Sequence, residues 1–205
     1  MAHIDPLARE DLAEFEPGFE LVEQMMGFVP NSMFTMARVP GLLPAFQGLG
    51  AAVLGNPIIP RDLAQMVAMM SSVGAGCRYC QAHTGHTAER MGVPPEKLEG
   101  IWTFETSEHF SDAERAALRI AFHSGQQPNA ATPADFDAAR EHYSDDEIAA
   151  IVAVCSLFGY LNRWNDTMAT TLEDRPRHFG ETVIASNGWN GDRHTLAEPI
   201  ADARG

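Results

Sequence analysis

The sequence predicts an all-α fold on three observations. Apolar residues recur at helical spacing, and the clearest stripe consists of Leu63, Met66, Val67, Met70 and Val73. No apolar–polar alternation of period two is long enough to seed a β-sheet. Proline and glycine residues divide the chain into segments of helix length.

Residues 21–172 carry the helical pattern, and we expect them to form one domain between two arms. The N-terminal arm, residues 1–20, is polar and acidic and is broken by Pro6 and Pro17. The C-terminal arm, residues 173–205, lacks a sustained apolar stripe and is rich in Gly, Pro, Arg, Asp and His. We therefore expect this arm to be irregular.

Helix-start signals place most of the helices. Asn31 or Ser32 can cap a helix that begins just after them. Ser111 and Glu114 form a capping-box pattern, and Pro133 suits a first helical turn. With the Gly and Pro stop signals, we expect helices over residues 33–38, 44–54, 60–73, 77–91, 95–103, 112–124, 133–142 and 145–172.

An internal repeat relates the helix of the apolar stripe to the last helix of the domain. A shift of 85 residues places several apolar residues of the first helix on apolar residues of the second. In this register Cys77 and Cys80 fall on Asn162 and Asn165. The pattern predicts a duplicated helix hairpin, and the alternative is a chance alignment of two Ala-rich amphipathic helices.

The composition argues against several classes of partner. A net charge of −14 over 205 residues disfavours nucleic acid and an anionic membrane surface. No apolar run approaches the roughly 20 residues needed to span a bilayer, and the acidic N-terminus lacks the basic-then-apolar order of a signal peptide. We expect a cytoplasmic protein, in which a CxxC pair is catalytic or metal-binding rather than part of a disulfide framework.

The chemistry concentrates in residues 76–86, which contain two of the three cysteines and two of the eight histidines. Cys77 and Cys80 lie at the expected start of a helix, where free N–H groups and the helix dipole stabilise a thiolate. His83 follows Cys80 by about one turn and can act as its base or charge partner. The two thiols are close enough to form a disulfide, so the pattern indicates a dithiol redox site.

Two other interpretations of the motif stay open. Cys77, Cys80, His83 and His86 are zinc-ligand residue types, but on a continuous helix they climb roughly 13 Å and rotate away from one another. Zinc holds its ligands at about 2.0–2.3 Å, so we expect no metal ion. The cysteines could also be purely structural.

Several segments resemble the alkyl hydroperoxidase D-like (AhpD-like) branch of the carboxymuconolactone decarboxylase family. They are residues 27–32, the helix 61–73 with the CxxC behind it, and residues 110–118 and 161–166. The resemblance covers about residues 20–172. It implies an AhpD-like helical bundle with an internally repeated helix pair, assembled as a trimer or hexamer. The decarboxylase branch usually lacks the CxxC, so its presence favours the redox branch.

The resemblance also implies roles for individual residues. Cys80 would react with peroxide, and Cys77 would resolve the product as a disulfide. The family's proton relay has a glutamate twelve residues before the first cysteine, where this chain has Gln65. It has a histidine four residues after the second cysteine, where this chain has Thr84. His83 would substitute for the relay histidine, and Gln65 would hold water or a side chain in place.

Four further residues are candidates for the substrate pocket. They are Tyr79, Thr84, His86 and Trp164. Helix packing is the alternative for Tyr79 and Trp164, and a solvated or subunit-interface position is the alternative for His86. Cys155 is expected to be a buried apolar thiol.

These observations predict a homo-oligomeric, thiol-dependent alkyl hydroperoxidase without a bound cofactor. Its substrate would be a hydroperoxide or another small molecule, and a dithiol reductant protein would restore the thiols. One alternative is a carboxymuconolactone decarboxylase-like lyase or isomerase in which the thiols are incidental. The other is a non-enzymatic redox-sensing oligomer.

Overall fold

The structure is a computed structural model that describes residues 2–195, and every regular element within this range is a helix. The all-α prediction is therefore confirmed. The α-helices are α1 (Glu16–Met26), α2 (Asn31–Met36), α3 (Leu42–Leu54), α4 (Arg61–Ala75), α5 (Arg78–Arg90), α6 (Pro95–Glu99), α7 (Asp112–Gly125), α8 (Pro133–Arg140), α9 (Asp145–Met168) and α10 (Asp174–Phe179). Short 3₁₀ turns form η1 (Arg9–Phe15), η2 (Gly100–Thr103), η4 (Ala185–Asn187) and η5 (Asp192–His194), and η3 (Gly180–Ile184) is a π-helical turn.

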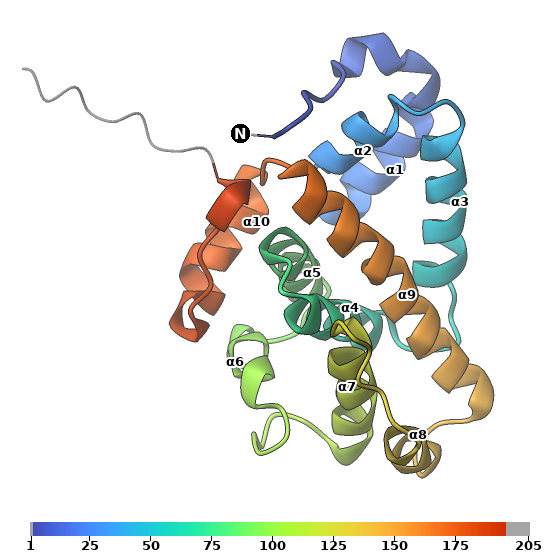
Figure 1. Ribbon diagram of the computed structural model, residues 1–205, viewed down its shortest axis with the longest axis vertical. Helices are drawn as coiled ribbons and strands as arrows, with labels where there is room; N and C mark the ends of the chain where they lie inside the picture. Colours follow the sequence, from blue (N-terminus) through green and yellow to red (C-terminus); the bar gives the residue numbers. More distant parts are fainter. Residues whose placement is uncertain (1, 196–205) are drawn as a thin grey trace, which may run out of the picture.

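Helix α4 lies at the centre of the bundle and packs against α5, α7 and α9 (Figure 1). The sequence predicts one apolar stripe on this helix, yet every residue from Leu63 to Ser72 is buried. Alanine, serine and methionine dominate the remaining faces, so neighbouring helices can approach α4 on all sides. The helix that leads into the CxxC is therefore the core of the molecule.

Helices α4 and α7 are in backbone contact where two glycines face each other. A Cβ atom at Gly74 would lie 2.3 Å from the carbonyl oxygen of Phe122, and one at Gly125 would lie 2.2 Å from the carbonyl oxygen of Ser71. Any larger side chain would separate the helices.

A sharp turn at Gly76 separates α4 from α5. Gly76 has a φ of +78°, a left-handed conformation that glycine adopts without strain. In the 85-residue register its counterpart is Leu161, and α9 runs through this point as one helix of 24 residues. The second unit of the repeat therefore does not form the hairpin that the sequence predicts, because it lacks a residue suited to the turn.

The two ends of the chain are more ordered than expected. Helix α1 begins at Glu16, inside the expected N-terminal arm, and residues of η1 and α1–α3 form a second small core. Part of the expected irregular arm forms α10 and the turns η3–η5, and α10 and η3 pack against α5 (Figure 1). A Cβ at Gly85 of α5 would lie 2.3 Å from Phe179, which shows how closely α10 approaches. Residues 196–205 of this arm lie outside the described residues.

Some helix ends also differ from the expectations. Helix α2 begins at Asn31 itself, with Pro30 before it, so the predicted capping by Asn31 or Ser32 is wrong. The Asn31 amide instead donates to the carbonyl oxygen of Thr171 over 2.9 Å. The capping box of Ser111 and Glu114 is confirmed. None of the helices in residues 2–195 combines the length and hydropathy that a membrane crossing requires.

Replacing Gly125 by alanine should destabilise the protein, because the new Cβ would collide with the Ser71 carbonyl and push α7 away from α4. Overpacking of this kind costs about 1–3 kcal/mol, which urea unfolding can measure. Gly48→Ala on α3 is the matched control, since a Cβ there meets nothing within 4 Å. It should stabilise α3 by about 0.5–1 kcal/mol. Equal stability of the two variants would contradict the close crossing.

Candidate functional site

The two cysteines of the motif lie at the N-terminus of α5. Cys77 is the N-cap, with extended backbone, and its Sγ accepts a hydrogen bond from the backbone N–H of Cys80 over 3.4 Å. The predicted helix start at the CxxC is thus confirmed. The cysteines are free thiols in this structure, and the single helical turn between them is the spacing that a redox-active pair uses.

Both thiols are shielded from solvent, since Cys77 is 0% exposed and Cys80 is 2% exposed. Burial, and in second place the adjacent Cys80, raise the pKa of Cys77 well above its usual value. Cys77 is therefore a neutral thiol at neutral pH, and a base must remove its proton before it can act as a nucleophile.

Cys80 receives a hydrogen bond from its counterpart in the repeat. The Nδ2 amide of Asn165 on α9 donates to the Sγ of Cys80 over 3.5 Å, and the two residues are 85 positions apart. The register found in the sequence therefore describes a direct contact in the fold. This hydrogen bond fixes the Cys80 sulfur against α9.

His83 is held by Glu173, which lies just before α10. The His83 Nε2 is 2.5 Å from one carboxylate oxygen, and the Tyr79 hydroxyl donates to the other over 2.9 Å. The backbone N–H of Asn31 also donates to Glu173. Burial would raise the pKa of Glu173, but the positive charge and hydrogen bond of His83 outweigh burial and lower this pKa. The Tyr79 ring stacks on His83 with centroids 4.1 Å apart.

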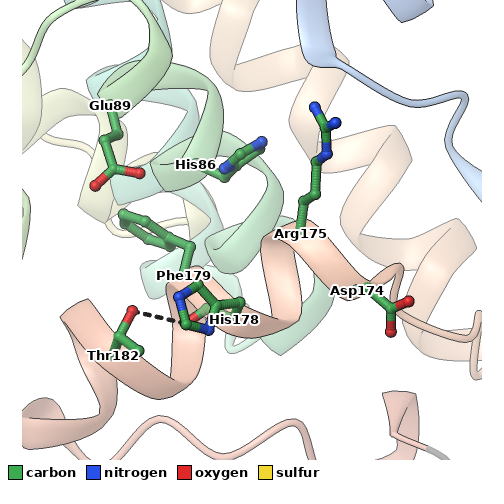
Figure 2. A pocket seen from close by; sticks show the side chains of 7 residues that line it. All are labelled: His86, Glu89, Asp174, Arg175, His178, Phe179 and Thr182. Carbon is green, nitrogen blue, oxygen red and sulfur yellow. Dashed lines mark hydrogen bonds between the residues drawn. The ribbon is translucent and has the colours of Figure 1, made fainter.

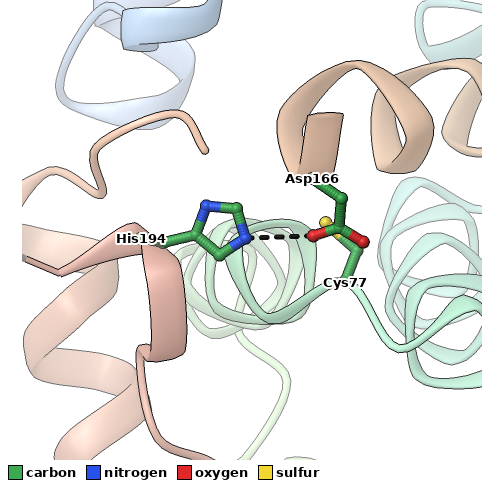
Figure 3. Close-up of side chains that lie close together, drawn as sticks. All are labelled: Cys77, Asp166 and His194. Atoms are coloured by element: carbon green, nitrogen blue, oxygen red, sulfur yellow. Dashed lines mark hydrogen bonds and ion pairs between the residues drawn. The ribbon is translucent and has the colours of Figure 1, made fainter. Parts of the chain in front are cut away.

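A second histidine–carboxylate pair lies beside Cys77 (Figure 3). The His194 Nε2 is 3.0 Å from an oxygen of Asp166, and the His194 Nδ1 is 2.9 Å from the carbonyl oxygen of Thr170. The Cys77 sulfur, the carboxylate and the imidazole nitrogen all lie within 4.8 Å of one another. These residue types are also those of metal sites, but the direct Asp166–His194 hydrogen bond already pairs the nitrogen with the carboxylate.

The other residues selected from the sequence are placed as follows. Gln65 is buried on α4, and no side-chain hydrogen bond joins it to another described residue. The Thr84 hydroxyl donates to the carbonyl oxygen of Cys80 over 2.7 Å. The Trp164 ring donates to the Thr35 hydroxyl, which joins α9 to α2. Tyr79 and Thr84 therefore surround the dithiol, whereas Gln65 and Trp164 make no contact with it through a hydrogen bond.

The described residues form a cavity away from the dithiol. It has a volume of about 410 Å³, and it lies between α5 and α10 (Figure 2). Its walls include His86, Glu89, Arg175 and Phe179 but none of the cysteines. His86 is 9% exposed, so the alternative of a solvated histidine is wrong. We place the functional site at the thiols rather than in this cavity, because the reactive groups and their partners are there.

Sequence reasoning missed two of the main residues of the site. Glu173 is the first residue of the expected irregular arm, and His194 lies in the same arm outside any motif. Both reach the dithiol only through the tertiary packing of residues 173–194 on α5. Gln65 was the one signal in the sequence that pointed to such residues. A relay histidine whose usual glutamate is replaced by glutamine needs a carboxylate from another part of the chain.

The fold and the CxxC together define an all-helical dithiol protein, and comparison with known proteins gives its family. A sequence model of the carboxymuconolactone decarboxylase family matches residues 40–122. The crystal structure of a Cys→Ala variant of the debrominase Bmp8, in complex with 2,3,4-tribromopyrrole, is 36% identical, with a TM-score of 0.84. The match covers 89% of this chain and 98% of that chain. The chain therefore belongs to the carboxymuconolactone decarboxylase family, as the resemblance in the sequence implies.

More distant relatives agree with the fold. The AhpD core of a peroxidase-related protein from Ralstonia eutropha JMP134 is 23% identical, over 80% of this chain and 87% of that chain, with a TM-score of 0.71. The protein YdfG of Bacillus subtilis (strain 168) is 25% identical over 109 residues, which are 52% of this chain and 71% of that protein. The AhpD-like helical bundle predicted from the sequence is confirmed.

Replacing Glu173 by glutamine should lower the stability in a pH-dependent way. The folded-state pKa of Glu173 is below the ordinary value of 4.5, so its charged form stabilises the protein above pH 4.5. This contribution is lost as the pH falls through the folded-state pKa. We expect the variant to be about 1–3 kcal/mol less stable at pH 7, and the difference from wild type to shrink below pH 4.5.

Chemical denaturation at pH 7 and below pH 4 measures this difference. Glu181→Gln is the matched control, since Glu181 belongs to the same segment but its side chain is 50% exposed and pairs with Arg177 at the surface. Its effect should stay within about 0.5 kcal/mol at both pH values. A Glu173→Gln effect that is independent of pH would contradict a charged Glu173 in the folded state.

Proposed function

We propose that this protein is a dithiol-dependent reductase that removes halogen from small halogenated aromatic rings. One observation carries the proposal: two thiols lie one turn apart at the start of α5, and the same helix carries His83, which is paired with the Glu173 carboxylate. Cys80 is the nucleophile and Cys77 is the resolving thiol. The relationship to a debrominase over nearly the whole chain supports the choice of substrate class.

In the first step the Cys80 thiolate attacks the halogen of the substrate. The electrons of the carbon–halogen bond stay with carbon, which takes up a proton, and Cys80 becomes a sulfenyl halide. His83 follows Cys80 by about one turn of α5, and its Nε2 is paired with the Glu173 carboxylate. We assign the proton that reaches carbon to His83.

In the second step Cys77 attacks the Cys80 sulfur. A disulfide forms, the halide leaves with the bonding electron pair, and the Cys77 proton goes to a base. The substrate has then gained two electrons and a proton, and the two thiols have supplied the electrons. A dithiol reductant protein in a reducing cytoplasm would restore the thiols by exchange.

Hydroperoxides are the second candidate substrates. Attack of the Cys80 thiolate on a peroxide gives a sulfenic acid and an alcohol, and the nearby Cys77 resolves the sulfenic acid to the same disulfide with release of water. The CxxC geometry and the AhpD-like fold support this reaction. The buried Gln65 weighs against it, because an amide cannot take the part of the relay glutamate.

We also propose that the protein is a homo-oligomer. Large apolar side chains are exposed on α1 and α3, among them Leu21, Met25 and Leu49, which are 50–57% exposed. Such side chains are typical of surfaces that a second copy covers.

The debrominase proposal predicts the behaviour of three cysteine variants. With 2,3,4-tribromopyrrole and dithiothreitol, wild-type protein should release bromide and a ring with one bromine fewer. Cys80→Ser should lose this activity by about 10³-fold or more, because the attacking thiolate is absent. Cys77→Ser without dithiothreitol should debrominate no more than one ring per chain.

Cys155→Ala is the matched control for these variants. Cys155 is buried on α9 and is not part of the CxxC motif, and burial raises its pKa to about 11. Its turnover should equal that of wild type. Bromide release that survives Cys80→Ser would remove Cys80 from the mechanism and contradict the proposal.

The hydroperoxide reaction predicts the outcome of a thiol titration with peroxide. One equivalent of cumene hydroperoxide should consume the thiols of Cys77 and Cys80 together and leave Cys155 reduced, as thiol counting and peptide mass spectrometry can show. Unchanged thiols after this treatment, with bromide release intact, would exclude the second candidate and leave the first.

A further inference from the structure

The His194–Asp166 pair has a fixed arrangement of protons. His194 is 1% exposed, and its Nδ1 lies 2.9 Å from the Thr170 carbonyl oxygen. A carbonyl oxygen can only accept, so Nδ1 carries a proton and donates it. The other nitrogen, Nε2, faces a carboxylate oxygen of Asp166 over 3.0 Å (Figure 3). Facing lone pairs on these two atoms would repel at this distance, so one proton lies between Nε2 of His194 and the carboxylate oxygen of Asp166.

The Asp166 carboxylate connects this pair to both the thiol and the solvent. Its oxygen lies within 4.8 Å of the Cys77 sulfur, while its side chain is 33% exposed. A proton that leaves Cys77 therefore has a nearby acceptor with access to water. Among the described residues, the ionisable groups beside Cys77 are Cys80 on α5, Asp166 on α9 and His194 on η5.

Cys77 needs such a partner because its surroundings disfavour the thiolate. Burial raises its pKa well above the usual value, so water at neutral pH ionises it slowly. His83 has its Nε2 bound to Glu173, and the cycle above assigns its proton to the substrate carbon rather than to Cys77. The molecule thus has two histidine–carboxylate pairs. In one, His83 of α5 is bound to Glu173, and in the other, His194 is bound to Asp166 beside Cys77.

We propose that Asp166 and His194 form the acid–base pair of Cys77, which takes its proton during disulfide formation and returns it during reduction. The proposal rests on the dithiol cycle above and holds for any oxidant of Cys80. In the forward step Cys77–SH and an oxidised Cys80 give the disulfide, the leaving group departs with its electron pair, and Asp166 receives the proton. In the reverse step a reductant thiolate attacks the Cys80 sulfur, and Cys77 leaves and is protonated by the pair.

Oxidation by diamide tests the pair without any assumption about the substrate. Diamide first forms an adduct on Cys80, and Cys77 then displaces the reduced diamide and forms the disulfide. Rapid mixing, acid quench and peptide mass spectrometry follow the two steps separately. In Asp166→Asn, which keeps a hydrogen bond to His194 but no negative charge, adduct formation should be unchanged. Disulfide formation should slow by about 100-fold.

The pH profile separates acid–base chemistry from a merely structural effect. Disulfide formation in Asp166→Asn should rise about tenfold per pH unit, because hydroxide must then remove the proton, whereas the wild-type rate should vary much less. His194→Gln should show the same slowing, and it provides a second variant should Asp166→Asn fold poorly. Asp146→Asn, an exposed change near the start of α9, is the matched control and should behave as wild type.

Three results would overturn the proposal. The first is equal rates of disulfide formation in Asp166→Asn, His194→Gln and wild type. The second is the absence of a Cys77–Cys80 disulfide in wild type, since the pair would then have no reaction to serve. The third is stoichiometric metal in the purified protein that is lost in these variants. Failure of debromination with normal diamide kinetics would reject only the proposed substrate.

Discussion

The Glu173 carboxylate accepts hydrogen bonds from three groups: the Asn31 N–H, the Tyr79 hydroxyl and the His83 ring. A carboxylate that is only 12% exposed costs several kcal/mol in folding unless such partners compensate. This charge is therefore compensated by hydrogen bonds only when three parts of the chain adopt one mutual arrangement. They are the start of α2, the CxxC helix and the C-terminal segment. The positions of both thiols depend on it, because His83 and Tyr79 belong to the same helix as Cys77 and Cys80.

The C-terminal segment from 173 to 194 covers the dithiol and is fastened at both ends. The Leu172 N–H donates to the carbonyl oxygen of His194 over 2.7 Å, and the Trp189 ring donates to the carbonyl oxygen of Arg78 over 3.0 Å. Because the thiols are buried beneath such contacts, the proposed reaction at Cys80 requires a covering segment to move. Exclusion of water from the closed site also strengthens its electrostatic interactions.

The sequence was sufficient for the features that depend on local chemistry. The start of α5 at the CxxC, the turn at Gly76 and the capping box of Ser111 follow from residue types at fixed spacing. The 85-residue register aligned Cys80 with Asn165, and the contact between these two residues is seen only in the structure. The roles of Glu173 and His194 could not be predicted, because long-range packing places them and no periodicity marks a polar segment that folds back over a helix.

The proposed acid–base partners of the thiols lie outside the residues that the family's sequence model matches. The family match ends at residue 122, whereas Asp166, Glu173 and His194 all follow it. Two relatives can therefore share the CxxC and still differ in how protons reach and leave it. In this fold the cysteines and the residues proposed to transfer their protons can therefore change independently of each other.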